Sequence, residues 1–155
     1  MKVSDIMIKD VITLNKENTI LQAAKVMRDK DIGFLIIEEN NEPVGVITDR
    51  DILLAISKEI SINTNITKVM KKYVIVVNEK DEISTATDTM GYMQVRRLVV
   101  IDDNNKIKGV LSVSDLLRYP LSEDLALETL IEISYNYPTQ SDFVNSTFQT
   151  SAFIF

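Results

Sequence analysis

The chain has 155 residues, of which 45% are hydrophobic and 26% charged, an ordinary globular composition with enough apolar material for a buried core. It contains no cysteine and no histidine, which excludes disulfide frameworks, thiol nucleophiles, imidazole bases and the common zinc sites. The formal charge of −6, the lack of a Lys/Arg cluster and the lack of a long apolar run argue against nucleic-acid and membrane binding. Because the chain also shows no signal-peptide core, we expect a cytoplasmic protein.

An internal duplication organises the chain. Residues 3–7 match residues 66–70, and the same register carries one helical stripe onto another. The apolar spacing i, i+3, i+4, i+7 predicts an amphipathic helix in each copy. The two stripes are Ile20, Ala23, Ala24 and Met27, and Ile83, Ala86, Thr87 and Met90.

A predicted strand hairpin follows each helix. The β-branched runs 34–37 and 98–101 lead through polar turns to second apolar runs at 44–47 and 107–111. A further helix begins after each hairpin, so each copy is predicted as β-α-β-β-α. One copy is too small to bury its apolar face well alone, so we expect a mixed α+β fold in which the two repeats pack as a pseudo-two-fold pair.

The predicted organisation has five parts. These are repeat 1 at 3–56, a linker at 57–65, repeat 2 at 66–118, a C-terminal helix at 119–133 and an irregular Ser/Thr/Phe-rich tail at 134–155. The helix is expected to carry Leu127, Leu130 and Ile131 on one side.

A shared motif stands at the junction between the second hairpin strand and the last helix of each copy. Residues 45–51 and 109–115 both read Gly-apolar-apolar-Thr/Ser-x-x-Asp. The hydroxyl can cap the helix while the carboxylate complements its dipole, and this structural role is common. A carboxylate beside a hydroxyl can also accept bonds from the two vicinal hydroxyls of a ribose, while free helix N–H groups receive phosphate.

The repeat, its order of elements and this junction resemble the cystathionine-beta-synthase (CBS) domain family over about residues 3 to 118. The second copy is also similar to a nucleotide-binding repeat of the AMP-activated protein kinase gamma subunit. The resemblance implies that Asp115 and Ser112 hold ribose and that Arg96 and Arg97 approach the phosphates, although the family more often has His-Arg there. The alternative is that these arginines are solvated or paired with Asp102 and Asp103.

The first copy offers Asp51 and Thr48 at the matching positions but no cation at 32–34. Arg50 is the candidate substitute, with a surface ion pair as its alternative role, so we expect the Asp115 site to be tighter. For adenine, the resemblance indicates the first strand of each repeat. The candidates there are Thr13, Ile12 and Ile75, whose other role is core packing.

The resemblance implies a regulatory module that binds AMP, ADP or ATP and works as a homodimer, and the residues present lead us to expect no enzyme activity and no catalytic cofactor. Nucleotide held between the repeats would change the conformation of the pair, or of two stacked pairs, and so act on an unknown downstream protein. The alternative is a structural protein-interaction module with vestigial nucleotide clefts. It would act through the tail, where Phe143, Phe148, Phe153 and Phe155 lie.

Overall fold

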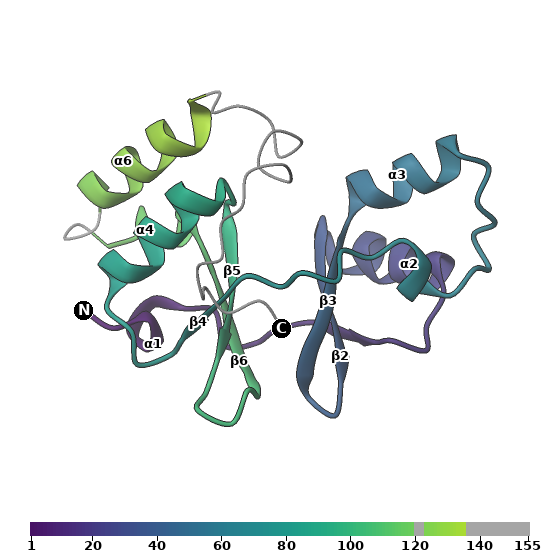
Figure 1. The fold of residues 1–155 in the computed structure, drawn as a ribbon, viewed down its shortest axis with the longest axis horizontal. Coiled ribbons are helices and arrows are strands. Elements are labelled where there is room, and N and C mark those ends of the chain that lie inside the picture. The colour runs from purple at the N-terminus through teal and green to yellow at the C-terminus, as the bar shows by residue number, and fades with distance from the viewer. Residues whose placement is uncertain (120–122, 136–155) are drawn as a thin grey trace, which may run out of the picture. The chain divides into compact units, whose positions relative to one another are not determined.

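The computed structural model describes residues 1–119 and 123–135, and their fold is mixed α+β, as predicted (Figure 1). Two three-stranded sheets have the orders β1-β2-β3 and β4-β5-β6. The elements are α1 (Val3–Ile6), β1 (Thr13–Asn15), α2 (Ile20–Lys30), β2 (Phe34–Glu39), β3 (Glu42–Thr48), α3 (Asp49–Ser57), the 3-10 helix η1 (Ile66–Lys68), β4 (Val76–Asn78), α4 (Ile83–Met93), β5 (Arg97–Ile101), β6 (Ile107–Ser112), α5 (Val113–Leu116) and α6 (Glu123–Ser134).

The first sheet shows how each repeat is built. Strand β1 pairs in parallel with β2, with helix α2 as the crossover, and β2 pairs with β3 in an antiparallel hairpin. Asn40 and Asn41 form the turn with φ values of 53° and 62°. Two successive positive φ values are those of a type I′ turn, whose twist matches the flanking strands and which favours Asn. The predicted hairpin is confirmed.

The predicted helical stripes are the core faces of α2 and α4. Each helix covers its sheet with residues spaced three or four apart, as expected for an amphipathic helix. The buried stripe residues are Ile20, Ala23 and Met27 in α2, and Ile83, Ala86, Thr87 and Met90 in α4. They pack on the central strands β2 and β5, whose apolar residues are almost entirely buried.

The chain forms two compact units, and each contains a piece of both sequence repeats. One unit comprises residues 1–9, 75–100 and the described residues from 108 on, and the other comprises residues 10–74 and 101–107. Val3 and Ile6 therefore belong to the core of the second repeat, while Ile66 belongs to that of the first. The segment that opens each repeat, residues 3–7 or 66–70, is thus exchanged: it packs in the core formed by the other repeat.

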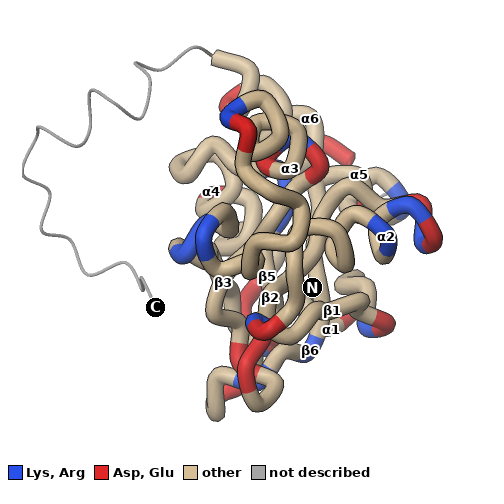
Figure 2. The backbone as a smooth tube through the Cα atoms, turned by 90° about the vertical axis from the view of Figure 1, so that its right-hand side faces the viewer, with Lys and Arg blue, Asp and Glu red and all other residues tan. Residues whose placement is uncertain are grey.

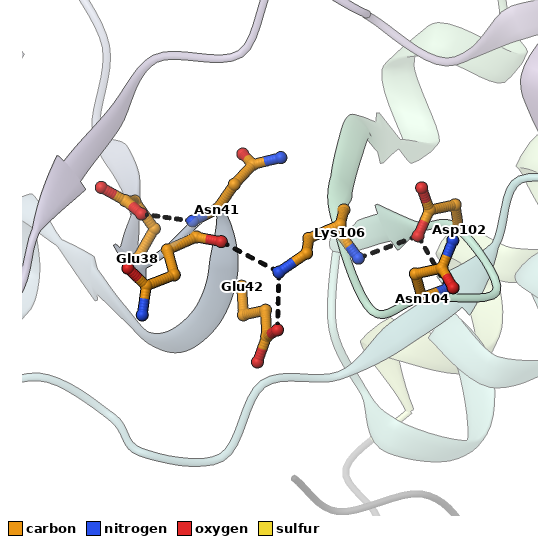
Figure 3. Close-up of polar contacts among 7 residues, drawn as sticks. Glu38, Asn41, Glu42, Asp102, Asn104 and Lys106 are labelled. Carbon is orange, nitrogen blue, oxygen red and sulfur yellow. Dashed lines mark hydrogen bonds and ion pairs between the residues drawn. The ribbon is translucent and has the colours of Figure 1, made fainter.

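The β5–β6 turn is tied to the β2–β3 turn by polar contacts (Figure 3). The Lys106 ammonium donates to Glu42 Oε1 at 2.7 Å and to the Asn40 carbonyl oxygen at 3.1 Å. The Ile107 N–H donates to the Asn41 carbonyl oxygen at 3.0 Å. These bonds explain why residues 101–107 form part of the unit built on the first repeat.

The C-terminal helix packs through a face of small residues. Helix α6 packs on α4 and α5, but it buries Ala126 and Thr129, while Leu127 and Ile131 remain 58% and 47% exposed. Leu127 and Ile131, which the sequence places on one side of the helix, therefore do not make this contact. Small side chains face α4 because α6 approaches it closely at Gly91, where a methyl group would overlap Glu132. The predicted tail from residue 136 on lies outside the described residues.

Candidate nucleotide-binding site

Each unit contains one hydroxyl–carboxylate pair at the end of its hairpin. Ser112, the last residue of β6, is the N-cap of α5, and Asp115 is the third residue of that helix. Asp115 Oδ2 accepts the Ser112 N–H at 2.9 Å and the Ser112 hydroxyl at 2.5 Å. The Ser112 hydroxyl oxygen also lies 2.8 Å from that of Ser114.

Thr48 and Asp51 reproduce the same arrangement at the start of α3. Asp51 Oδ2 accepts the Thr48 N–H at 2.9 Å and the Thr48 hydroxyl at 2.7 Å, and the Asp51 N–H donates back to Thr48 Oγ1 at 3.2 Å. Both motifs are thus complete capping boxes, which satisfy donors that a helix start leaves without partners. The capping role that the sequence indicated is present in both copies.

Capping uses one oxygen of each carboxylate and leaves the other facing an exposed cation. Asp51 Oδ1 lies 3.7 Å from Lys71 Nζ, and Asp115 Oδ1 lies 3.4 Å from Arg118 Nη1. The side chains of Lys71 and Arg118 are 63% and 67% exposed, whereas those of Asp51 and Asp115 are 13% and 2% exposed. Each carboxylate therefore has a second oxygen that a ligand hydroxyl reaches only by displacing a solvent-exposed side chain.

The motif glycines let the exchanged segments approach closely. Gly45 and Gly109 are buried, and neither has a positive φ. A methyl group on Gly109 would lie 2.8 Å from the Ile8 carbonyl oxygen, and one on Gly45 would lie 3.0 Å from the Lys71 carbonyl oxygen. Glycine is needed at both positions because main chain crosses directly over the strand.

The arginines predicted to approach phosphate lie at the start of β5. Arg96 and Arg97 are both exposed, and the Arg96 carbonyl oxygen accepts the Val113 N–H at 3.1 Å, next to the start of α5. In the other unit Gly33 takes the corresponding place and accepts the Asp49 N–H at 3.2 Å. The Asp49 carboxylate lies over Gly33, so the first copy has a negative group where the second has a cation.

Arg50, the substitute cation named from the sequence, is exposed in the first turn of α3. Its main-chain N–H donates to Asp49 Oδ1 at 2.7 Å. Arg50 is thus the neighbour, in sequence and by this bond, of Asp49, whose carboxylate lies over Gly33.

The residues predicted to contact adenine lie on or beside the first strand of each sheet. Thr13 begins β1 and pairs with Ile36, and Ile12 packs against the same core; both are half-buried. Ile75 precedes β4, and its carbonyl oxygen accepts the Val99 N–H at 3.1 Å. The core-packing role is observed for Ile12 and Ile75.

The candidate residues fall into two sets, one in each compact unit. One set is Ile12, Thr13, Thr48, Arg50 and Asp51, and the other is Ile75, Arg96, Arg97, Ser112 and Asp115. Lys71 joins the first set and Arg118 the second, and the sequence analysis identified neither. In residues 1–119 and 123–135, no group of three or more Asp or Glu side chains is arranged to hold a metal ion. Over the same residues, no helix has the length and apolarity of a membrane span.

The CBS domain family matches residues 3–58 and 66–122. These two matches cover most of the chain and coincide with the two β-α-β-β repeats described above. The chain belongs to the CBS domain family, and it is a tandem CBS pair.

Relatives share the same region. The chain is 38% identical over 118 residues to a 17.7 kDa protein of Acidianus ambivalens, covering 76% of this chain and 71% of that one. It is 30% identical over 134 residues to the CBS domain-containing protein YhcV of Bacillus subtilis, covering 86% and 95%. It spans only 39% of the Methanocaldococcus jannaschii protein MJ1232, to which it is 36% identical over 76% of its own length.

Solved CBS proteins have the same fold. The Thermoplasma acidophilum protein TA0289 superposes with a TM-score of 0.72 at 25% identity, over 85% of this chain and 75% of that one. The CBS domain pair of protein MJ0100, in complex with 5′-methylthioadenosine and S-adenosyl-L-methionine, has a TM-score of 0.68 at 28% identity, over 76% and 94%.

Proposed function

We propose that the chain is a regulatory module that binds an adenine nucleotide and has no enzyme activity. The observation that carries the proposal is the matched pair of hydroxyl–carboxylate groups, each with one carboxylate oxygen not used in capping. A carboxylate is a strong acceptor for the vicinal hydroxyls of ribose. The adenosine-containing ligands of the MJ0100 pair support this ligand class.

The proposed roles follow the geometry. Asp115 and Ser112 hold the ribose in one unit, and Asp51 and Thr48 hold it in the other. Because Oδ2 of each aspartate is committed to the helix cap, the ribose bonds to Oδ1, and Arg118 swings away from Asp115. The remaining contacts are proposed for the phosphate residues Arg96, Arg97 and Arg50, and for the adenine residues Ile12, Thr13 and Ile75.

The regulatory part of the proposal is that ligand binding changes the conformation of the pair or of its homodimer. The same region makes up 23% of an inosine-5′-monophosphate dehydrogenase of Methanocaldococcus jannaschii, to which it is 34% identical over 119 residues. A module found within a larger enzyme supports a control role. Light scattering and limited proteolysis, with and without saturating nucleotide, test it, and identical profiles would contradict it.

Binding is tested by following thermal unfolding during titration with AMP, ADP, ATP and S-adenosylmethionine. A ligand that binds only the folded protein stabilises it by about 2.7 kcal/mol at one hundred times Kd. Asp115→Asn is expected to reduce the shift. The matched control is Asp5→Asn, because Asp5 Oδ2 accepts the Lys2 N–H at 2.8 Å in a helix cap without the motif hydroxyl. Asp5→Asn should leave the ligand-induced shift unchanged.

One observation favours a second candidate, a structural interaction module with vestigial sites. Asp115 Oδ2 is committed to the helix cap, Oδ1 lies 3.4 Å from Arg118 Nη1, and the side chain is 2% exposed. On this alternative the carboxylates only cap helices, and none of the four ligands changes the melting temperature. That outcome would overturn the nucleotide proposal. Chromatographic analysis of the ligand after incubation tests for enzyme activity, which would consume it.

A further inference from the structure

Lys71 is held beside the Asp51 motif by its main chain. The Lys71 N–H donates to the Val46 carbonyl oxygen at 2.8 Å, and the Val46 N–H donates to the Lys71 carbonyl oxygen at 2.9 Å. These two bonds hold the Lys71 backbone opposite Val46. Val46 lies two residues before Thr48, where β3 ends. Gly45 makes this approach possible. The position of the Lys71 α-carbon is therefore set by the fold rather than by its charge.

The Lys71 side chain is free to change partner. Its ammonium lies 3.7 Å from Asp51 Oδ1, which is longer than a hydrogen bond, and its side chain is 63% exposed. Because the lysine is exposed and the contact is long, this pair contributes little to stability. A ribose hydroxyl that bonds to Asp51 Oδ1 would release the ammonium, and the four-carbon stem gives it the reach to follow a phosphate attached to that ribose.

The other side of the motif has the opposite charge. The Asp49 carboxylate lies over Gly33, at the place that corresponds to Arg96. The Asp49 carboxylate repels a phosphate there, and Arg50, the cation next to it, has a main-chain N–H that donates to this carboxylate. Lys71 supplies a positive charge on the Asp51 side.

The second unit has no cation at the position of Lys71. Ile8 makes the same paired main-chain bonds, with its N–H donating to Val110 at 2.9 Å and its carbonyl oxygen accepting from Val110 at 3.0 Å. The two ligand sites are thus built on one backbone pattern but differ at this position, where one has an ammonium and the other an alkyl group.

We propose that Lys71, in addition to Arg50, recognises the phosphate at the Asp51 site, and that Lys71 makes this site selective for adenosine 5′-phosphates over uncharged adenosine derivatives. The inference rests on the proposed function, and it assigns a phosphate contact of the first repeat to the segment that opens the second. In this role Lys71 is a specificity-determining residue, since its charge meets a group that only the phosphorylated ligands carry.

The test is calorimetric titration of the full chain with AMP and with 5′-methylthioadenosine, which has no phosphate. Asp115→Asn is the background, so that binding reports on the Asp51 site. In that background, Lys71→Met removes the ammonium and keeps the stem. We expect about tenfold weaker AMP binding, as for the loss of one hydrogen bond to a charged group, and unchanged methylthioadenosine binding. Lys72→Met, with the same change in net charge, should leave both affinities unchanged.

The outcomes separate the two proposals. If wild-type protein binds neither ligand, the proposed function fails and the inference fails with it. If the wild type binds but the Asp115→Asn protein binds neither ligand, the inference fails and the proposed function stands. The inference also fails, and the proposed function stands, if Lys71→Met weakens the binding of both ligands equally or of neither. The same conclusion follows if Lys72→Met weakens AMP binding as much as Lys71→Met does. A thermal melt of each variant verifies that it is folded.

Discussion

The carboxylate oxygen Oδ2 of Asp115 accepts both the main-chain N–H and the hydroxyl of Ser112. The bond closes a helix of only four residues, α5, at a place where both partners are buried. Sequence periodicity has no part in this arrangement, because the cap depends on two side chains three positions apart. The motif is therefore a structural requirement of the fold as well as the proposed ribose contact.

Removing the cap hydroxyls is expected to destabilise the two units unequally. Loss of an N-cap residue costs about 1 kcal/mol. Ser112→Ala should cost more than Thr48→Ala, because the Asp115 side chain is 2% exposed and the Asp51 side chain 13%. A buried acceptor that loses a donor cannot turn to water instead. Urea unfolding measures both, and Ser112→Thr, which keeps the hydroxyl, is the control. Equal costs would contradict this account.

Gly109→Ala is expected to destabilise the protein by about 1–3 kcal/mol, the usual range for overpacking. The added methyl would lie 2.8 Å from the Ile8 carbonyl oxygen, and main chain cannot move as a side chain can. Gly33→Ala is the matched control, since its nearest contact, also at 2.8 Å, is the exposed Asp49 carboxylate. Thermal or urea unfolding compares the two. A Gly33→Ala cost as large as that of Gly109→Ala would show that the close approach is not responsible.

The observed face of α6 gives a third prediction. Leu127→Ala and Ile131→Ala should each change the free energy of unfolding by less than about 0.5 kcal/mol, because both side chains are exposed. Ala126→Leu should cost about 1–3 kcal/mol by overpacking the contact of α6 with its neighbours. Urea unfolding measures all three. A large cost at Leu127 and none at Ala126 would contradict the observed packing face.

Glu82 gives the protein a specific response to acid. The hydrogen bond from the Lys2 ammonium, and next that from the N-terminal amine, hold the pKa of the Glu82 carboxyl below its usual value. A lowered folded-state pKa adds stability that is fully present above the unfolded value, about 4.3 for Glu, and is lost as the pH falls through the folded value.

Glu82→Gln should therefore lose less stability than the wild type as the pH falls below about 4.3. Denaturant titrations at a series of pH values measure the difference, and Glu128→Gln on the exposed side of α6 is the control. Parallel stability curves for Glu82→Gln and the wild type would contradict the assignment.

The sequence predicted what depends on local periodicity. The stripes of α2 and α4 and the Asn40–Asn41 hairpin lie where the apolar spacing and turn residues indicated. Duplication strengthened each inference, because a pattern that occurs twice in register is unlikely to arise by chance. The lack of a Lys/Arg cluster in the sequence agrees with the structure. In Figure 2, Lys and Arg positions are interspersed with Asp and Glu along the described chain.

What the sequence did not reveal depends on contacts between distant segments. Residues 3–7 and 66–70 are equally good matches for either core, so the pattern could not show that they are exchanged. Lys71 was missed for the same reason, since it reaches Asp51 only through that exchange. The sequence also could not show which face of α6 packs, since Thr129 can be buried there because its hydroxyl donates to the Leu125 carbonyl oxygen and so needs no water.

The exchange of the opening segments also bears on synthesis. When Val3 and Ile6 leave the ribosome, their partners Ile83 and Leu98 have not yet been made. The core that contains Ile20 similarly waits for Ile66. Neither core can close from its own repeat alone, so large loops must form before the packing that stabilises them. The core that contains Ile20 is therefore complete once residues 66–70 have emerged, whereas the core that contains Val3 is completed only after the second hairpin has emerged.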